Sequence, residues 1–275
     1  MAQEVKLTAS TRVNLLSLQN TTKLIGRTQE RLSTGQKVNS ALDDASAFFQ
    51  ARALTNRAAD LSSVKDGIDQ AIQTLKAAVG GIESATKIVE QIKGLAAAAK
   101  NTTSTAERSQ LANQAEQLAA QLDLLINDAS YNGLNLIKAT PDNMQVNFNE
   151  DATFELTIVG QNLAAANLGN NISTATNNWG TVGDVNADLD EYVSALGQLR
   201  TAAATLGSQN TLLQTRFDFV NDIVNTLKEG SDKLTLADIN EEGANLLALQ
   251  TRQQLGINSL SLAAQSEQAI LRLFQ

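Results

Sequence analysis

Two adjacent carboxylates, Asp43 and Asp44, are the side chains of this sequence that come nearest to a catalytic or metal-binding pair. Paired carboxylates can hold a divalent cation or divide the work of a general acid and a general base. No third ligand is evident beside them, and a negative charge near a helix N-terminus is itself stabilising. We therefore interpret the pair as a helix-start or intersubunit feature.

Other reactive groups are scarce in the chain. It contains no histidine and no cysteine, which removes the usual general base near neutral pH, the thiolate nucleophile and the soft metal ligands. The Gly80-Gly81 pair lacks the Lys-Ser/Thr that follows the glycines of a phosphate-binding loop. We expect a protein that is not an enzyme and that uses no cofactor or metal.

The net charge of −8 limits the partners of the chain. Nucleic acids and anionic membranes would repel the average surface. No stretch has the length and apolarity of a membrane span, and residues 1–30 lack the pattern of a secretory signal. We expect no nucleic-acid binding, no membrane insertion and no cleaved signal peptide.

Three runs of apolar residues recur at alternating spacings of four and three, which is the pattern of a helix that buries one seam against another helix. The first run comprises Val64, Ile68, Ala71, Leu75, Ala78, Ile82, Ala85, Val89, Ile92, Ala96 and Ala99. The second comprises Leu111, Ala115, Leu118, Leu122, Leu125 and Ala129, and the third includes Leu196, Leu199, Leu206, Leu213, Phe217, Val220 and Val224. The polar segment 101–105 between the first two runs predicts the turn of an antiparallel helical hairpin.

The length of the first run predicts an elongated fold. It spans about 54 Å at the rise of an α-helix, whereas a compact chain of this size has a diameter of roughly 48 Å. We therefore expect a mainly α, antiparallel coiled-coil rod.

The heptad pattern breaks at mid-chain, between residues 140 and 190. Met144, Val146 and Phe148 alternate with polar residues, and so do Phe154, Leu156 and Ile158. Residues 149–152 between them are typical of a turn, so this segment predicts a small β-hairpin. Residues 167–184 are expected to form an irregular loop.

Both ends of the chain carry weaker helical stripes. The N-terminal stripe consists of Leu18, Ile25 and Leu32, and the C-terminal stripe includes Ile257, Leu260, Leu271 and Phe274. Lone helices of this kind are marginal in water. We therefore expect paired terminal helices that gain order from each other and from neighbouring subunits, with these apolar residues as polymer contacts.

The segment Arg31-Leu32-Ser33-Thr34-Gly35, followed by Val38-Asn39-Ser40-Ala41-Leu42-Asp43-Asp44-Ala45, resembles the signature of bacterial flagellins at the connection between terminal helix and rod. Its signature positions are Arg31, Gly35, Asn39, Asp43 and Asp44. Further similarity lies at 66–68, at Arg108 with 131–136, at 206–210 and at 237–242. The resemblance covers about residues 1–138 and 190–275.

The resemblance implies a structural subunit that is exported unfolded through the flagellar type III channel and polymerises into the extracellular flagellar filament. It also implies a filament cap, hook-associated junction proteins and an export chaperone as partners. We expect a terminal inner-tube helix at 1–42, rod segments at 43–139 and 191–234, a variable region at 140–190 and a second inner-tube helix at 235–275. A hook-filament junction protein shares both terminal signatures and is the alternative.

Flagellins that activate the Toll-like innate receptor carry Gln-Arg-Val-Arg-Glu-Leu-Ala on the rod. The aligned stretch here is 90–96, in which Gln91 replaces the central arginine and Lys93 and Leu95 occupy neighbouring positions. Loss of a fork-shaped, always-charged donor removes charge-assisted contacts. The sequence therefore predicts weak or absent activation of that receptor.

Overall fold

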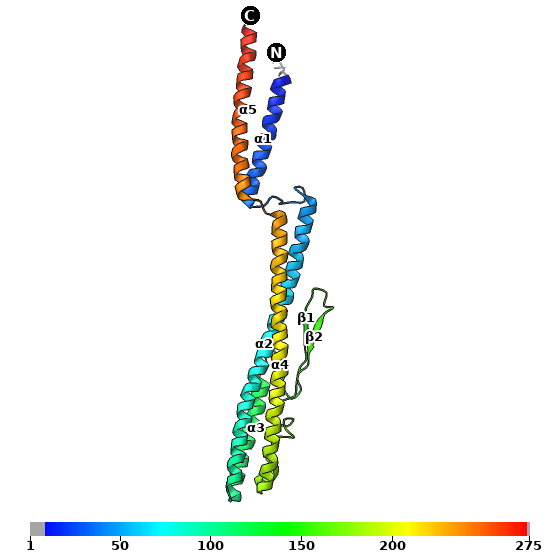
Figure 1. Cartoon of the computed structure of the whole chain (residues 1–275), viewed down its shortest axis with the longest axis vertical. Helices are drawn as coiled ribbons and strands as arrows, with labels where there is room; N and C mark the ends of the chain where they lie inside the picture. Colours follow the sequence, from blue (N-terminus) through cyan, green and yellow to red (C-terminus); the bar gives the residue numbers. More distant parts are fainter. Residues whose placement is uncertain (1–8, 274–275) are drawn as a thin grey trace. The chain divides into compact units, whose positions relative to one another are not determined.

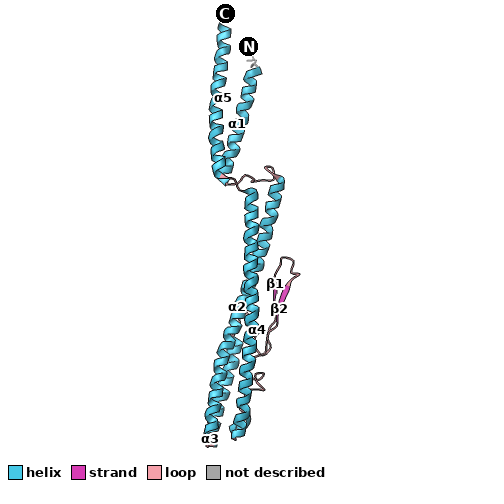
Figure 2. Ribbon diagram, in the orientation of Figure 1, coloured by secondary structure: helices cyan, strands magenta, loops and turns pink. Residues whose placement is uncertain are grey.

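The computed structural model describes residues 9–273, except for the side chains of residues 267, 268 and 270–273. Its helices are α1 (Ala9–Thr34), α2 (Ala45–Asn101), α3 (Thr105–Asp128), α4 (Val182–Thr235) and α5 (Ile239–Leu273) (Figures 1 and 2). The other elements are β1 (Met144–Asn147), β2 (Glu155–Ile158) and the short 3-10 helix η1 (Thr176–Trp179). The prediction of a mainly α chain with a mid-chain β-hairpin is confirmed.

The chain packs as two compact units. The terminal unit consists of Met1–Asn56 with Thr226–Gln275, and the central unit consists of Arg57–Asn225. Among the described residues, no helix is both long and apolar enough to cross a bilayer.

In the central unit, α2 buries the seam that its heptads predict. Ile68, Leu75, Ile82, Val89 and Ile92 are all at most 1% exposed, whereas Val64 at the start of the seam is half-buried. The antiparallel partner α4 buries Leu213 and Val220. Phe217, also predicted for the seam, is only half-buried, and the ammonium group of Lys65 lies over its ring, 5.8 Å from the ring centroid.

The seam on α3 differs from the predicted one. The residues that α3 buries are Arg108, Ala112, Ala115, Ala119, Leu122 and Ile126. Ala115 and Leu122 belong to both patterns, but Leu118 is half-buried, and Ala119 takes the inward position. Alanine at three of the inward positions lets the helix axes approach closely, and the larger leucines then fit at the flanks of the contact. Apolar residues occupy both registers, so the sequence pattern alone favoured the wrong one.

The β-hairpin of the central unit has Met144 paired with Ile158 and Val146 paired with Leu156. Met144, Val146 and Ile158 are buried, which places one face of the hairpin on the helices. Phe154, which the alternating pattern groups with Leu156 and Ile158, precedes β2, and its side chain is exposed. Its backbone closes the turn, because its N–H donates to Asn149 Oδ1 and its carbonyl accepts from the N–H of Phe148.

Residues 159–181, which we call the strap, run from β2 to α4 and carry a small core of their own. Leu163, Ala165, Leu168, Ile172 and Trp179 are buried. Two carboxylates of α3 hold the strap backbone: Asp123 Oδ1 accepts from Ala165 N at 2.7 Å, and Glu116 Oε1 accepts from Ala175 N at 3.0 Å. The expected irregular loop is therefore a packed layer along α3.

Helix α4 begins at Val182, inside the segment expected to be hairpin and loop. Thr181 and Asp184 cap it reciprocally, because Asp184 N donates to Thr181 Oγ1 and Asp184 Oδ2 accepts from Thr181 N. The Thr181 hydroxyl also donates to Asp184 Oδ2 at 2.8 Å, and this bond, followed by the one from Thr181 N, is the largest cause that lowers the pKa of Asp184.

Candidate functional site

Helices α1 and α5 of the terminal unit lie antiparallel. Arg31 Nη1 donates to Glu242 Oε1 at 2.8 Å near one end of the pair. Further along, Gln253 Nε2 donates to Thr22 Oγ1 at 3.4 Å. Leu18 packs so closely on Gly256 that a Cβ there would lie 2.9 Å from its Cδ1. The chain therefore brings together the two terminal segments that carry the predicted polymer contacts.

The seam between these helices is poor in apolar surface. Thr11, Thr21, Ile25 and Thr28 are the buried residues of α1. The Thr21 hydroxyl donates to the carbonyl of Ser17 within its own helix, so it adds no bond between the helices. Burial of a threonine yields much less hydrophobic free energy than burial of a leucine. The pair is therefore weakly held for two helices of this length.

The predicted polymer contacts fall mostly near the seam. Ile25 is buried, Leu18, Leu32 and Leu260 are half-buried, and Ile257 is 45% exposed. Phe274 and the side chain of Leu271 lie outside the described residues. Their role as polymer contacts stays a prediction.

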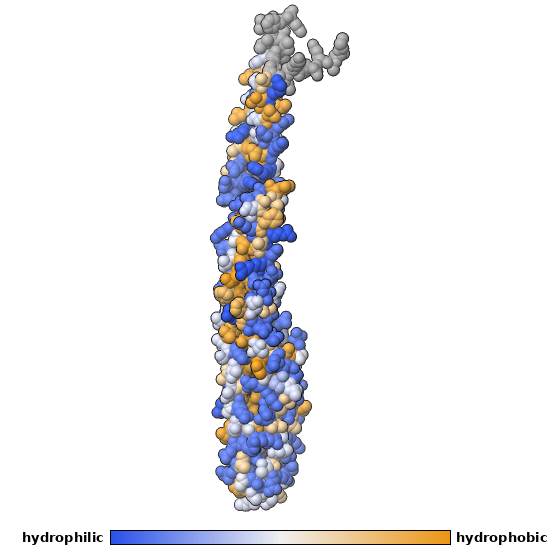
Figure 3. Space-filling model, turned by 90° about the vertical axis from the view of Figure 1, so that its right-hand side faces the viewer, coloured by the Kyte–Doolittle hydropathy of each residue, from blue (hydrophilic) through white to orange (hydrophobic). Residues whose placement is uncertain are grey.

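Other large apolar side chains of the described part of the helix pair are more exposed. On α5, Leu247, Leu255 and Leu262 are 62–67% exposed and Ile239, at the start of the helix, is 61% exposed. On α1, Val13 is 64% exposed and Leu16 is 60% exposed. At 100° per residue, the three leucines fall within about 80° of one side of the helix. We call Leu247, Leu255 and Leu262 the outer stripe. Apolar side chains interleave with polar ones on the surface of this helix pair (Figure 3).

The outer stripe does not follow from the sequence pattern, because a pattern with one apolar face per helix accounts for only one contact surface. Residues spaced by seven near the chain ends pick out the face that meets the partner helix. The signal in the sequence for a second contact surface is the spacing of Leu247, Leu255 and Leu262, which are eight and seven residues apart. Apolar side chains that recur along one exposed side of a helix can pack against a neighbouring helix.

The signature positions at the helix connection have structural roles. Gly35 has φ +71°, a conformation that favours glycine, and its N–H donates to Arg31 O at 2.8 Å to end α1. Gln36 then forms an isolated antiparallel bridge with Leu236, which joins the connection after α1 to the one before α5. Arg31 completes the junction through its ion pair with Glu242.

Asp43 and Asp44 serve two different capping roles. Asp43 Oδ2 accepts from Asn39 N, Ser40 N and the Ser40 hydroxyl, at 3.0–3.1 Å. Asp44 Oδ1 accepts from Ala47 N at 3.0 Å and thereby caps α2. Among the described residues there is no group of three acidic side chains placed to hold a metal ion. The pair organises the chain between α1 and α2.

We expect the Asp43 loop to open in acid. The backbone hydrogen bond from Ser40 is the largest cause that lowers the pKa of Asp43 below its ordinary 3.8. A lowered folded pKa gives a stabilisation that is fully present above the unfolded pKa and is lost as the pH falls through the folded one. Amide exchange at Asn39 and Ser40, corrected for its intrinsic pH dependence, should therefore accelerate below about pH 4.

The Asp43→Ala variant should show that faster exchange already at neutral pH. Asp190→Ala, at an exposed position of α4, is the matched control and should leave Asn39 and Ser40 unchanged. Protection of Ser40 that survives in Asp43→Ala would contradict the assignment.

The positions equivalent to the innate-receptor motif lie along α2. Gln91 and Leu95 line a shallow groove of about 780 Å³ between α2 and α3, together with Gln114, Gln117 and Leu118 of α3. Lys93 is half-buried beside it. Gln91 is exposed, so its side chain is accessible in the single chain.

Comparison with known proteins gives two family matches that together cover both helical ends. Residues 6–141 match the bacterial flagellin N-terminal helical region, and residues 189–274 match the bacterial flagellin C-terminal helical region. The unmatched residues 142–188 hold the hairpin, the whole strap and the start of α4.

Similar proteins match over almost the whole chain. Flagellin FljO of Caulobacter vibrioides is 30% identical over 95% of this chain and 96% of its own length. A flagellin of Brucella melitensis biotype 1 is 28% identical over 95% of each. The crystal structure of Bacillus cereus flagellin superposes on 56% of this chain and 88% of its own, with 16% identity and a TM-score of 0.48.

Proposed function

Because this chain belongs to the bacterial flagellin family, the structural proteins of the extracellular flagellar filament, we propose that it polymerises through the paired helices α1 and α5. The outer stripe of α5 is the observation that supports this assignment, since three leucines on one side of a helix are left to solvent in the single chain. Contact with neighbouring copies would remove them from water.

The weak threonine seam supports an assembly step in which order is gained on joining the polymer. An isolated helix pair with little buried apolar surface is marginal in water. Such ends suit a chain that is exported unfolded by the flagellar type III system and folds on arrival. A filament cap, hook-associated junction proteins and an export chaperone are the partners that we assign to it by family resemblance.

Electron microscopy of the purified chain tests the proposal. We expect filaments of micrometre length to grow from the monomer, and deletion of residues 256–275 to abolish them while far-ultraviolet circular dichroism still reports the helices of the central unit. Stacks of only a few copies would point to a junction protein instead. Intact assembly after the deletion would show that α5 does not carry the polymer contacts.

We further propose that the surface around Gln91 activates the Toll-like innate receptor weakly. The reason is that Gln91 offers no charged, bidentate donor where activating flagellins have arginine. A reporter-cell assay with purified monomer should show little response, and Gln91→Arg should raise it, because the exposed position accommodates the longer side chain. Lys87→Arg, which adds no charge, is the control. Strong activation by the unchanged chain would contradict this proposal.

A further inference from the structure

The sequence contains a single Asn-Gly dipeptide, Asn132-Gly133, and the structure places it in a tight turn after α3. Tyr131 and Leu134 form an isolated antiparallel bridge across this turn, in which the N–H of each donates to the carbonyl of the other at 3.0 Å. Asn132 has φ +51° and Gly133 has φ +81°, the pair of left-handed residues that a two-residue turn of this kind requires. Both residues are exposed.

An asparagine that precedes glycine can lose its side-chain amide without an enzyme. The backbone nitrogen of Gly133 attacks Cγ of Asn132, so that the new N–Cγ bond forms as the Cγ–Nδ2 bond breaks and ammonia leaves with the proton from Gly133 N. Water then opens the cyclic imide at either carbonyl, which gives aspartate or isoaspartate and releases one proton. Glycine favours the attack because it has no Cβ to hinder the approach of its nitrogen. Asparagine is for such reasons one of the thermolabile residues.

The hydrogen bonds of the turn leave both reacting groups free. Among the described residues, no group accepts the N–H of Gly133, and none bonds to the side-chain amide of Asn132. A backbone N–H that is committed to an acceptor has to give up that hydrogen bond before its nitrogen can attack. At this turn only the bridge between Tyr131 and Leu134 has to open, and exposed turns open at little cost in free energy.

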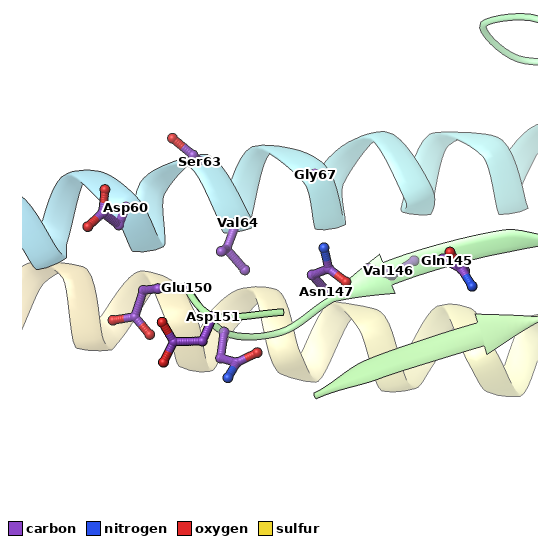
Figure 4. A pocket seen from close by; sticks show the side chains of 10 residues that line it. Asp60, Ser63, Val64, Gly67, Gln145, Val146, Asn147, Glu150 and Asp151 are labelled. Atoms are coloured by element: carbon purple, nitrogen blue, oxygen red, sulfur yellow. The ribbon is translucent and has the colours of Figure 1, made fainter. Parts of the chain in front are cut away.

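Two other exposed asparagines lack this freedom. Asn39 is followed by Ser40, whose N–H donates to Asp43 Oδ2 at 3.0 Å. Asn147 of β1 directs its side chain toward α2 across the cleft beside the hairpin (Figure 4), and the N–H of the next residue, Phe148, donates to the hairpin at 2.9 Å. The structure therefore separates Asn132 from these asparagines by the free N–H that follows it.

The turn lies where a new charge and a longer backbone would be felt. Tyr131 and Asn132 line a groove of about 250 Å³ together with Gly67 of α2 and Gln145 of β1, and these last two residues also border the cleft of Figure 4. A carboxylate at position 132 adds a negative charge to this groove. Isoaspartate also inserts a CH₂ group into the backbone, which breaks the spacing of the two hydrogen bonds between Tyr131 and Leu134.

We propose that Asn132-Gly133 is a self-modification site, at which the folded chain converts Asn132 to aspartate and isoaspartate with water as the only co-reactant. The inference goes beyond the proposed function and does not depend on polymerisation, because every step takes place within one chain. Water does not reverse the hydrolysis. The isoaspartyl fraction of a long-lived extracellular polymer would therefore increase with its age.

Peptide mapping by mass spectrometry tests the site in the folded chain. Incubation in mildly alkaline buffer, which favours loss of the Gly133 amide proton, should add about one mass unit at Asn132 and give two chromatographically distinct products. The rate should lie within about tenfold of the rate in denaturant, because the turn opens easily. Asn39 should be modified only in denaturant. Loss of the Asn132 amide in denaturant but not in the folded chain would overturn the proposal.

Two variants separate the role of the hydrogen bonds from that of the sequence. Asp43→Ala frees the N–H of Ser40 and should make Asn39 reactive in the folded chain, while the rate at Asn132 stays unchanged. An Asn39 that stays inert in this variant would contradict the assignment of reactivity to a free N–H.

Hydrogen exchange measures the consequence for the turn. Exchange at the Tyr131 and Leu134 amides should accelerate in the modified chain. Asn132→Gln, which would have to close a larger ring and so keeps its side-chain amide, is the matched control and should exchange equally before and after incubation. Unchanged exchange in the modified natural chain would refute the opening of the turn. None of these measurements uses filaments, so their failure leaves the proposed polymerisation standing, and failure to polymerise leaves this site standing.

Discussion

Replacement of Leu255 and Leu262 by serine is expected to raise the lowest concentration at which the chain polymerises by about a hundredfold or more. The two leucines are 62% and 66% exposed in the single chain, so their loss should hardly affect the monomer. Full burial of a leucine contributes about 1.5–3 kcal/mol, and each 1.4 kcal/mol changes an association constant tenfold. Sedimentation of polymer over a concentration series measures the shift.

The matched control for this variant is Leu124→Ser, because Leu124 is similarly exposed (57%) but belongs to α3 of the central unit. We expect it to polymerise within threefold of the unchanged chain, and circular dichroism should show equal helix content in all three proteins. If the double serine variant polymerised at the same concentration as the unchanged chain, the outer stripe would not be part of the interface between copies.

Arg108→Met is expected to destabilise the central unit by about 3 kcal/mol or more. The side chain is only 7% exposed, and its guanidinium donates to the carbonyls of Trp179 at 3.0 Å and Gly180 at 2.7 Å. Methionine fills the volume but donates no hydrogen bond, and each buried acceptor left without a partner costs about 1–3 kcal/mol. In a unit of this size the melting midpoint should fall by about 6–12 °C.

The backbone that Arg108 holds makes this loss larger. Asn177, Asn178 and Trp179 all have φ between +47° and +55°, a region that non-glycine residues seldom occupy. Arg200→Met, at an exposed position of α4, is the control and should melt within 1 °C of the unchanged chain. A midpoint for Arg108→Met within 2 °C would show that the strap is held by other contacts.

The sequence predicts the fold correctly where its apolar residues are compatible with only one buried face of a helix. On α2, every position of the predicted seam from Ile68 to Ala99 is apolar and buried, and polar residues flank most of them, so the register follows. The α3 seam was predictable only in part, since Leu118 and Ala119 are both apolar and the choice depends on how closely α2 approaches.

The strap could not be predicted because its order comes from distant residues. Trp179 is fully buried, and its indole N–H donates to Asp188 Oδ2 at 2.7 Å, but no periodic pattern surrounds it. Asp188 itself is only 1% exposed. The charged residues Asp190 and Glu191 close by in the sequence would instead suggest that this part of the helix faces solvent. A lone tryptophan in a segment expected to be loop was the available signal.

The position of Trp179 also has a spectroscopic consequence. The chain has one tryptophan and two tyrosines, and all three, Trp179, Tyr131 and Tyr192, belong to the central unit. Tryptophan and tyrosine fluorescence therefore reports on the central unit alone, while far-ultraviolet circular dichroism of the peptide groups reports on every helix. Heating the chain while recording both signals separates the loss of the terminal helices from the loss of the central unit, without any added dye or label.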